Sequence, residues 1–145
     1  MLQRFESFVS GITLCYKYIQ RIKSAEMTEF GLKGTHAMCL FFLHQYAEGL
    51  TAATLCQLCA EDKAAISRTL NSLRDRGLID SQGNAYRANW QLTAEGVEVA
   101  ERLNGMIESW VEIGGEGLTE AERACFYQTL GRIAENLRER QKNED

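Results

Sequence analysis

The chain has 145 residues, of which 45% are hydrophobic and 25% charged, and its formal net charge is −4. The length is typical of one globular domain, and the net charge argues against a protein that binds nucleic acid with its whole surface. The charge is unevenly distributed, because residues 92–145 carry twelve acidic and six basic side chains whereas residues 62–91 carry three acidic and five basic ones. This asymmetry indicates that residues 92–145 form an acidic scaffold and that residues 62–91 form a basic surface that contacts the partner.

Five cysteines, an odd number, are scattered through segments with helical patterns. This distribution predicts reduced thiols in a cytoplasm rather than a disulfide framework. No segment approaches the roughly 18 uncharged apolar residues of a membrane span. The apolar N-terminus is interrupted by Glu6 and continues its helical pattern through Lys17 and Arg21, so we interpret it as a helix and not as a signal peptide. We therefore expect a soluble cytoplasmic protein without a membrane partner.

The first two predicted elements are helices. Over residues 4–27 an apolar stripe recurs at spacings of three and four, formed by Phe5, Phe8, Ile12, Cys15, Ile19 and Ile22. "FGLKG" (30–34) breaks this helix with two glycines. Thr35 is then expected to cap a second helix, "HAMCLFFLHQYA", which is apolar on most sides and so is predicted to be central.

Two short amphipathic helices follow, about a turn apart. Thr51 is the expected cap of the first, whose inward stripe contains Leu55, Cys56 and Cys59. Asp62 is the expected cap of the second, which carries Ile66, Leu70 and Leu73 on one face and ends at Gly77. This arrangement is typical of a helix-turn-helix.

A β-hairpin and two long helices complete the pattern. Apolar Tyr86, Ala88, Trp90 and Leu92 alternate with Arg87, Asn89 and Gln91 after the turn residues 82–84, which predicts a hairpin. Thr93 is expected to cap a helix that runs to about Ile113, where "GGEG" breaks it. Thr119 and Glu122 form a capping box for a last helix, 120–141, with an apolar stripe at Phe126, Leu130, Ile133 and Leu137.

The order of elements predicts a mainly α fold with a small β-hairpin wing, that is, a winged helix-turn-helix with dimerisation helices at both ends. We expect a single domain over 1–145, with the winged lobe at 34–92 and dimerisation helices at 1–30 and 93–145. The apolar stripes of the terminal helices look incompletely buried. The simplest solution is that they pair with each other and with a second copy of the chain.

The fourth helix offers a face that suits DNA. Its outer positions are Lys63, Ala64, Ser67, Arg68 and Asn71. In the major groove, arginine pairs with guanine, asparagine pairs with adenine, alanine packs on a thymine methyl group, and lysine and serine hold phosphates. Arg74 either touches phosphates or favours the helix C-terminus, and Arg87 on the wing could reach a minor groove. The alternative for this face is an ordinary solvated surface.

These segments resemble the MarR family of bacterial transcriptional regulators. The likeness lies in "GLKGTHAMCLFFL" (31–43), "GLTAATLCQLCAEDKAAISRTLNSLRDRGLI" (49–79) and "LTAEG" (92–96), the last similar to the family's "LTxxG". It implies an obligate homodimer that reads a pseudo-palindromic double-stranded DNA operator, with Thr51, Lys63, Ser67, Arg68 and Asn71 at the interface. The wing departs from the family, which often has Asp-x-Arg where this chain has Asn84 and Tyr86, so Arg87 falls one residue late.

Other side chains could bind a ligand or sense oxidants. Tyr16, His36 and Trp110 are candidates for lining an effector pocket. An aromatic core or dimer interface is the preferred explanation for Tyr16 and Trp110, and a helix cap or a satisfied boundary position is preferred for His36. Cys15 is a candidate redox residue, because the family that this chain resembles includes peroxide sensors with a cysteine in the first helix, but packing within the apolar stripe is the favoured explanation. "CQLC" (56–59) lacks a second pair of ligands, so core packing is favoured over zinc.

We find no nucleophile motif, phosphate loop or paired carboxylates, and we expect no enzyme, no metal and no cofactor. The best interpretation is a homodimeric repressor whose DNA affinity is modulated by a small-molecule effector. Two alternatives stay open at this point. One is a thiol-based redox regulator that uses Cys15, and the other is a winged-helix protein-interaction module without DNA binding.

Overall fold

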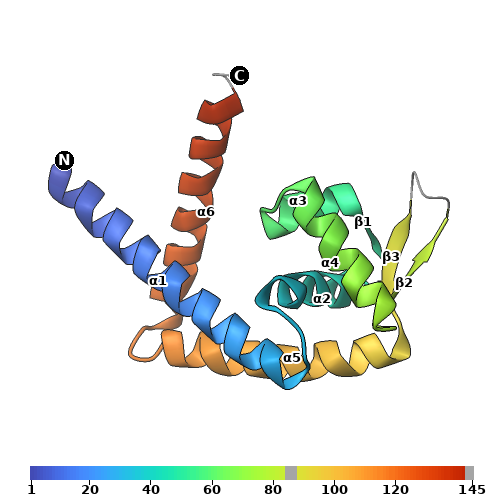
Figure 1. The fold of residues 1–145 in the computed structure, drawn as a ribbon. Coiled ribbons are helices and arrows are strands. Elements are labelled where there is room, and N and C mark those ends of the chain that lie inside the picture. Colours follow the sequence, from blue (N-terminus) through green and yellow to red (C-terminus); the bar gives the residue numbers. More distant parts are fainter. Residues whose placement is uncertain (84–87, 143–145) are drawn as a thin grey trace. The chain divides into compact units, whose positions relative to one another are not determined.

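The computed structural model describes residues 1–83 and 88–142. Its elements, in chain order, are α1 (Leu2–Glu29), α2 (Gly34–Gln45), β1 (Leu50–Thr51), α3 (Ala52–Cys59), α4 (Lys63–Asp75), β2 (Ile79–Gln82), β3 (Asn89–Leu92), α5 (Ala94–Gly114) and α6 (Glu120–Lys142) (Figure 1). This arrangement confirms the predicted mainly α fold with a winged helix-turn-helix. Two compact units can be distinguished, Met1–Met106 and Ile107–Asp145.

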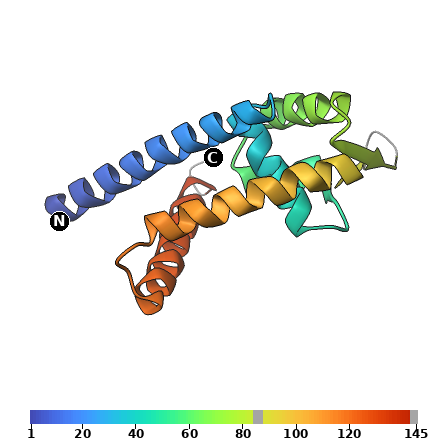
Figure 2. The ribbon, with the colours of Figure 1, turned by 90° about the horizontal axis from the view of Figure 1, so that it is seen from below.

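The core of the first unit is built around α2. This helix is apolar on most sides, as expected, and Ala37, Cys39, Leu40 and Leu43 are buried. Its neighbours contribute further buried side chains: Met27 from α1, Leu55 from α3, Leu73 from α4 and Ile79 from β2. In Figure 1, α2 lies between the α3–α4 pair and the first half of α5, and in Figure 2, seen from below, α5 crosses in front of α2. Contact with neighbouring elements on most sides explains why α2 lacks a polar face.

The start of α2 differs from the prediction. Thr35 was expected to cap this helix, but the helix already begins at Gly34 and Lys33 occupies the N-cap position. His36 supplies the capping interaction, because its Nδ1 accepts a hydrogen bond from the backbone N–H of Lys33 at 2.8 Å. A residue at the third helical position can satisfy the N-cap N–H in this way, as Glu or Gln does in a capping box. The alternative role of His36 as a cap is therefore confirmed.

The wing belongs to a three-stranded antiparallel sheet with the order β1-β3-β2. Ile79 pairs with Leu92 and Ser81 with Trp90, which confirms the hairpin. The third strand, β1, pairs Leu50 with Trp90 and was not predicted. A strand of two residues cannot show period-two alternation, so only the tertiary pairing reveals it. Of the predicted wing residues, Asn84, Tyr86 and Arg87 lie outside the residues that the structure describes.

The second unit comprises the end of α5, the glycine-rich turn and α6. The predicted capping box is confirmed: Thr119 Oγ1 accepts from the N–H of Glu122 at 3.3 Å, and Glu122 Oε2 accepts from the N–H of Thr119 at 2.8 Å. This backbone hydrogen bond, together with one from the Thr119 hydroxyl, lowers the pKa of Glu122. Arg123 Nη2 donates to the carbonyl oxygen of Gly115 at 2.9 Å and so holds the turn against the first turns of α6.

The apolar stripes at both ends of the chain are largely exposed. On α1 the exposed members include Phe5, Phe8, Ile12 and Ile19, and on α6 they include Phe126 and Leu137. Among the described residues, no helix is long and apolar enough to span a bilayer. Amphipathic helices with exposed apolar stripes are typical of an association surface.

Candidate nucleic-acid interface

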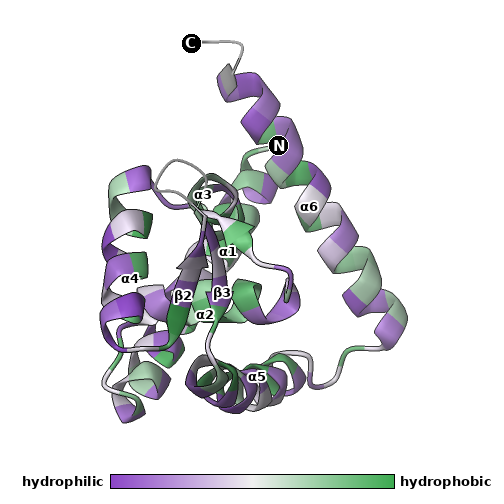
Figure 3. Ribbon diagram, turned by 90° about the vertical axis from the view of Figure 1, so that its right-hand side faces the viewer, coloured by the Kyte–Doolittle hydropathy of each residue, from purple (hydrophilic) through white to green (hydrophobic). Residues whose placement is uncertain are grey.

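Helix α4 has one buried and one exposed face. The predicted inward stripe is confirmed, because Ile66, Leu70 and Leu73 are no more than 2% exposed. Lys63, Ala64, Ser67, Arg68 and Asn71 all lie on the exposed side. Figure 3 shows the same division as hydrophilic and hydrophobic colours alternating along the helix. The burial of one face fixes which side chains the helix offers to a partner.

The N-terminal end of α4 is held by Asp62. Its Oδ1 accepts a hydrogen bond from the backbone N–H of Ala65 at 2.7 Å, which confirms the predicted cap. Because this carboxylate is engaged with the helix backbone, the neighbouring Lys63 is the charged group that projects from the first turn.

The C-terminal end of α4 is closed by Gly77, as predicted. This residue has φ +73°, the left-handed conformation that favours glycine. The N–H of Gly77 donates to the carbonyl of Arg74 at 2.8 Å, and the N–H of Leu78 donates to Leu73 at 3.0 Å. Such bonds satisfy the last carbonyl groups of a helix and fix where the chain leaves it.

Helix α3 precedes α4 by a tight turn. Thr51 caps α3, because its Oγ1 accepts from the backbone N–H of Thr54 at 3.2 Å, and its side chain stays on the surface. At the other end, Ala60 adopts φ 53° and the N–H of Glu61 donates to Cys56 at 3.1 Å. The two helices contact each other, so α3 packs against α4 and helps to fix its position.

The "LTAEG" segment ties α5 to the end of α4. Thr93 Oγ1 accepts from the N–H of Gly96 at 3.0 Å, which confirms it as the cap of α5, and donates to the carbonyl of Gly77 at 2.6 Å. The backbone N–H of Thr93 donates to Leu78 at 3.1 Å. Gly96 lies so close to Leu78 that a Cβ atom there would overlap the Leu78 carbonyl oxygen. Sequence reasoning identified the motif but not this link.

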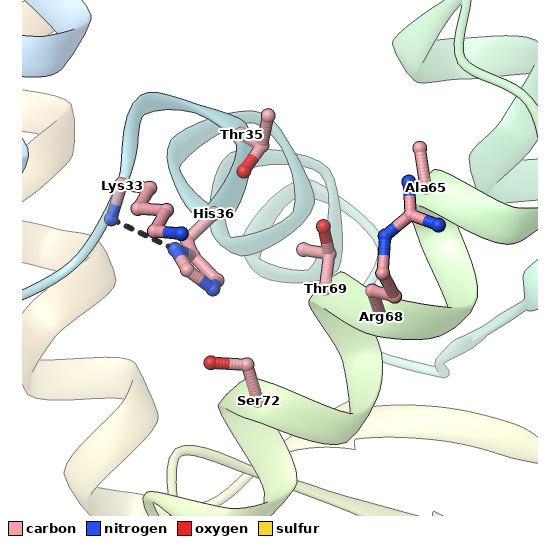
Figure 4. A pocket seen from close by; sticks show the side chains of 7 residues that line it. All are labelled: Lys33, Thr35, His36, Ala65, Arg68, Thr69 and Ser72. Atoms are coloured by element: carbon pink, nitrogen blue, oxygen red, sulfur yellow. Dashed lines mark hydrogen bonds between the residues drawn. The ribbon is translucent and has the colours of Figure 1, made fainter.

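A pocket of about 210 Å³ lies between the start of α2 and the side of α4. Figure 4 shows its walls, formed by Lys33, Thr35, His36, Ala65, Arg68, Thr69 and Ser72. His36 is buried, and burial lowers the pKa of its imidazole, with the charges of Arg76 and Lys33 adding to the effect. The pocket therefore combines a neutral imidazole and three hydroxyl groups with two cationic side chains. Two predicted residues, His36 and Arg68, meet here, whereas Lys33, Thr69 and Ser72 were not predicted.

The remaining predicted site residues are more scattered. Arg74 is exposed and forms an ion pair with Asp75 at 3.3 Å, so a structural role at the helix end competes with phosphate binding. Tyr16 is 63% exposed on α1 and Trp110 is 39% exposed on α5, and neither lines the pocket beside His36. Cys15 is exposed on α1. Within the described parts of the chain, no group of three metal-binding side chains is found.

Comparison with known proteins gives the same winged-helix fold. Residues 30–86 match the model of the MarR family. A MarR family transcriptional regulator from Listeria monocytogenes, crystallised with a 26mer DNA, has a TM-score of 0.78 and 21% identity over 89% of this chain and 87% of its own.

Two further solved structures share the fold. The complex of S. aureus MepR with DNA has a TM-score of 0.77 and 18% identity over 87% of this chain and 93% of that one. A MarR/EmrR family transcriptional regulator from Acinetobacter sp. ADP1 has a TM-score of 0.82 and 20% identity over 96% of this chain and 99% of its own. No curated protein matches the chain.

Proposed function

We propose that this chain, whose winged-helix lobe matches the model of the MarR family, is a DNA-binding transcriptional regulator that acts as a homodimeric repressor in the cytoplasm. The observation that carries the proposal is the exposed face of α4. Its buried stripe and its two fixed ends leave Lys63, Ser67, Arg68 and Asn71 pointing outward as one surface. The DNA complexes of the Listeria regulator and of MepR, which share this fold, also support the proposal.

Each side chain of this face has a proposed role. Arg68 donates two hydrogen bonds to guanine and Asn71 pairs with adenine, while Lys63 and Ser67 contact phosphates and Ala64 packs on a thymine methyl group. Thr51, exposed at the start of α3, adds a phosphate contact. Two such helices in a dimer would enter successive major grooves about 34 Å apart. Residues 34–92 carry five acidic and five basic side chains, so the net charge of the lobe does not attract DNA and these few contacts must supply the affinity.

Direct titration tests the proposal. The purified protein is titrated with a DNA fragment from upstream of its own gene, with excess nonspecific competitor and at several salt concentrations. Arg68→Ala removes a base contact in each protomer, so we expect a loss of roughly 1–3 kcal/mol per half-site and relaxed sequence preference. Lys63→Ala removes a phosphate contact per protomer, so the slope of log K against log salt should shrink by about 2 for a dimer.

A matched control separates specific effects from net charge. Arg132 is an exposed arginine on α6, away from α4 in the sequence and outside the proposed DNA-binding face. Because α6 also carries the proposed dimer stripe, sedimentation must first show that this variant associates as the parent protein does. Arg132→Ala changes the charge of the protein as Arg68→Ala does and should leave sequence preference intact. Equal losses for both variants, or no competitor-resistant site in a genomic selection, would contradict specific recognition by α4. In that case a protein-interaction role for the lobe would be the better interpretation.

The homodimer is proposed from the exposed apolar stripes of α1 and α6. Burial of large apolar side chains is the main driving force for association, and Phe5 and Phe126 are 66% and 53% exposed in a single chain. We expect sedimentation equilibrium to give a dimer and Phe126→Glu to weaken it. A monomer at micromolar concentration with DNA binding retained would contradict this part of the proposal.

The proposed effector site is the pocket beside α4. Its cations and hydroxyl groups suit a small anion, and a ligand that contacts Arg68 there would compete with DNA for the same side chain. Benzoate is a suitable probe. We expect it to lower operator affinity in the parent protein but much less in a Thr69→Ala/Ser72→Ala variant, since both hydroxyl groups face the pocket and not the exposed face. An equal effect in both proteins would place the ligand elsewhere.

A further inference from the structure

Two cysteines from different helices meet inside the winged lobe. Cys39 is fully buried on α2, and Cys59 is the last residue of α3 and half-buried. Their sulfur atoms are 4.0 Å apart, although the residues are separated by 20 positions in the sequence. Cys56 lies one turn before Cys59 on the same helix and is also half-buried. The "CQLC" spacing singles out Cys56 and Cys59 in the sequence, whereas the contact between sulfur atoms joins Cys59 to Cys39 on another helix.

We propose that Cys39 and Cys59 are a peroxide-oxidisable dithiol that closes to an intramolecular disulfide between α2 and α3. A disulfide needs the two sulfur atoms at about 2.05 Å, and their present separation can be reduced by side-chain rotation and a small movement of the end of α3. That end adjoins the left-handed residue Ala60 and the short turn to α4, where the backbone is irregular.

The two thiols have different roles. The hydrogen bond with Cys39 lowers the pKa of Cys59; burial and the carboxylate of Glu61 oppose this shift, and the ammonium group of Lys23 adds to it. The same hydrogen bond, with burial, raises the pKa of Cys39. Cys59 is also the more accessible of the two sulfurs, so a small oxidant reaches it first. Cys59 is therefore the attacking thiolate and Cys39 the resolving thiol.

The reaction balances with one molecule of hydrogen peroxide. The Cys59 thiolate attacks one peroxide oxygen, the O–O bond breaks, and a sulfenic acid and hydroxide are formed. Cys39 then attacks the Cys59 sulfur, the S–S bond forms, and the hydroxyl group leaves as water with the thiol proton. Two thiols are oxidised and one peroxide is reduced to two waters. In the described part of the molecule no cluster of three metal-binding side chains competes with this chemistry.

Peptide mapping tests the proposal without any assay of DNA binding. The background protein carries Cys15→Ser and Cys125→Ser, which remove the two exposed thiols and so prevent links between chains. It is treated with hydrogen peroxide while folded, blocked with N-ethylmaleimide and cleaved after glutamate. Cleavage after Glu29, Glu48 and Glu61 separates peptide 30–48, which contains Cys39, from peptide 49–61, which contains Cys56 and Cys59. Trypsin would leave all three on one peptide, since no lysine or arginine lies between Lys33 and Lys63.

We expect peptides 30–48 and 49–61 to be linked in the background protein and in its Cys56→Ser variant, and to be separate in Cys39→Ser and Cys59→Ser. Thermal melting of each variant confirms that it is folded, and Cys59→Ser, at a half-buried position, is the decisive one. Three results would overturn the proposal. They are a link inside peptide 49–61, a link to peptide 30–48 that survives Cys59→Ser, and oxidation of Cys59 to sulfinic acid without any disulfide.

Discussion

Gly96 is the position where the structure makes the sharpest prediction. Its backbone approaches the end of α4 so closely that a methyl group there would overlap the carbonyl oxygen of Leu78 and lie 2.9 Å from the carbonyl carbon. Both atoms belong to the backbone, so no side-chain rotation relieves the overlap. In Gly96→Ala, the start of α5 must therefore move away from Leu78, and the hydrogen bonds that Thr93 makes to Gly77 and Leu78 are stretched.

The expected change in the free energy of unfolding of Gly96→Ala follows from three effects. Overpacking at a close contact costs about 1–3 kcal/mol. Each weakened hydrogen bond contributes roughly another 1 kcal/mol. Alanine is the better helix former by about 1 kcal/mol, which offsets part of the loss. We expect Gly96→Ala to lower the free energy of unfolding by a net 2–4 kcal/mol, in order of magnitude.

Gly105 provides a matched control on the same helix. It is exposed, and a Cβ atom added there meets nothing within 4 Å, so only the helix-propensity effect remains. Gly105→Ala should raise the stability by up to about 1 kcal/mol. Urea denaturation of both variants at one protein concentration measures the difference, since association would otherwise contribute. If Gly96→Ala proved as stable as Gly105→Ala, the argument from close backbone approach would be wrong.

Three further predictions concern the lobe. Burial lowers the pKa of His36, so the stability that its neutral form provides is complete above the ordinary pKa of 6.5 and is lost as the pH falls through the lowered value. Thermal melts over this pH range should show the loss of stability in the parent protein. The loss should be much smaller in His36→Gln, which keeps an acceptor for the cap. Asp62→Ala removes the cap of α4 and should cost about 1 kcal/mol in urea denaturation, whereas Asp62→Asn should cost little. The disulfide between Cys39 and Cys59 closes a loop between residues 20 positions apart and should stabilise the folded lobe by roughly 3 kcal/mol, reduced by any strain in the bond. Oxidation should therefore raise the melting temperature, and dithiothreitol should reverse the rise. A melting temperature that oxidation leaves unchanged or lowers would show that strain outweighs the effect of closing the loop.

Much of the fold could be predicted from local signals in the sequence. The stripe of Ile66, Leu70 and Leu73 determined which face of α4 is buried, and thereby which side chains are exposed. Thr51, Asp62 and the Thr119–Glu122 box were predictable because a capping interaction spans only three residues. Helix ends elsewhere were less certain: at α2 the cap came from an unusual residue, and Thr35 was the conventional but incorrect choice.

Contacts between distant segments could not be predicted in this way. The strand β1 is defined only by its pairing with β3, and the pocket requires the start of α2 to face the side of α4. The pairing of Cys39 with Cys59 depends on how two helices cross, a distance that neither periodicity nor spacing encodes. The same limitation applied to "LTAEG", whose threonine was recognised as a cap while its second hydrogen bond was not.

That second hydrogen bond gives the motif a role beyond starting a helix. Thr93 joins three groups at one point: the N–H of Gly96 in α5, the carbonyl of Gly77 at the end of α4, and through its own N–H the carbonyl of Leu78. The end of α4 is therefore held by the start of α5 rather than by the wing alone. A displacement of the first turn of α5 must either break these bonds or carry the end of α4 with it. Because a Cβ atom at position 96 would force such a displacement, operator affinity and stability should fall together in Gly96→Ala, while Gly105→Ala keeps both.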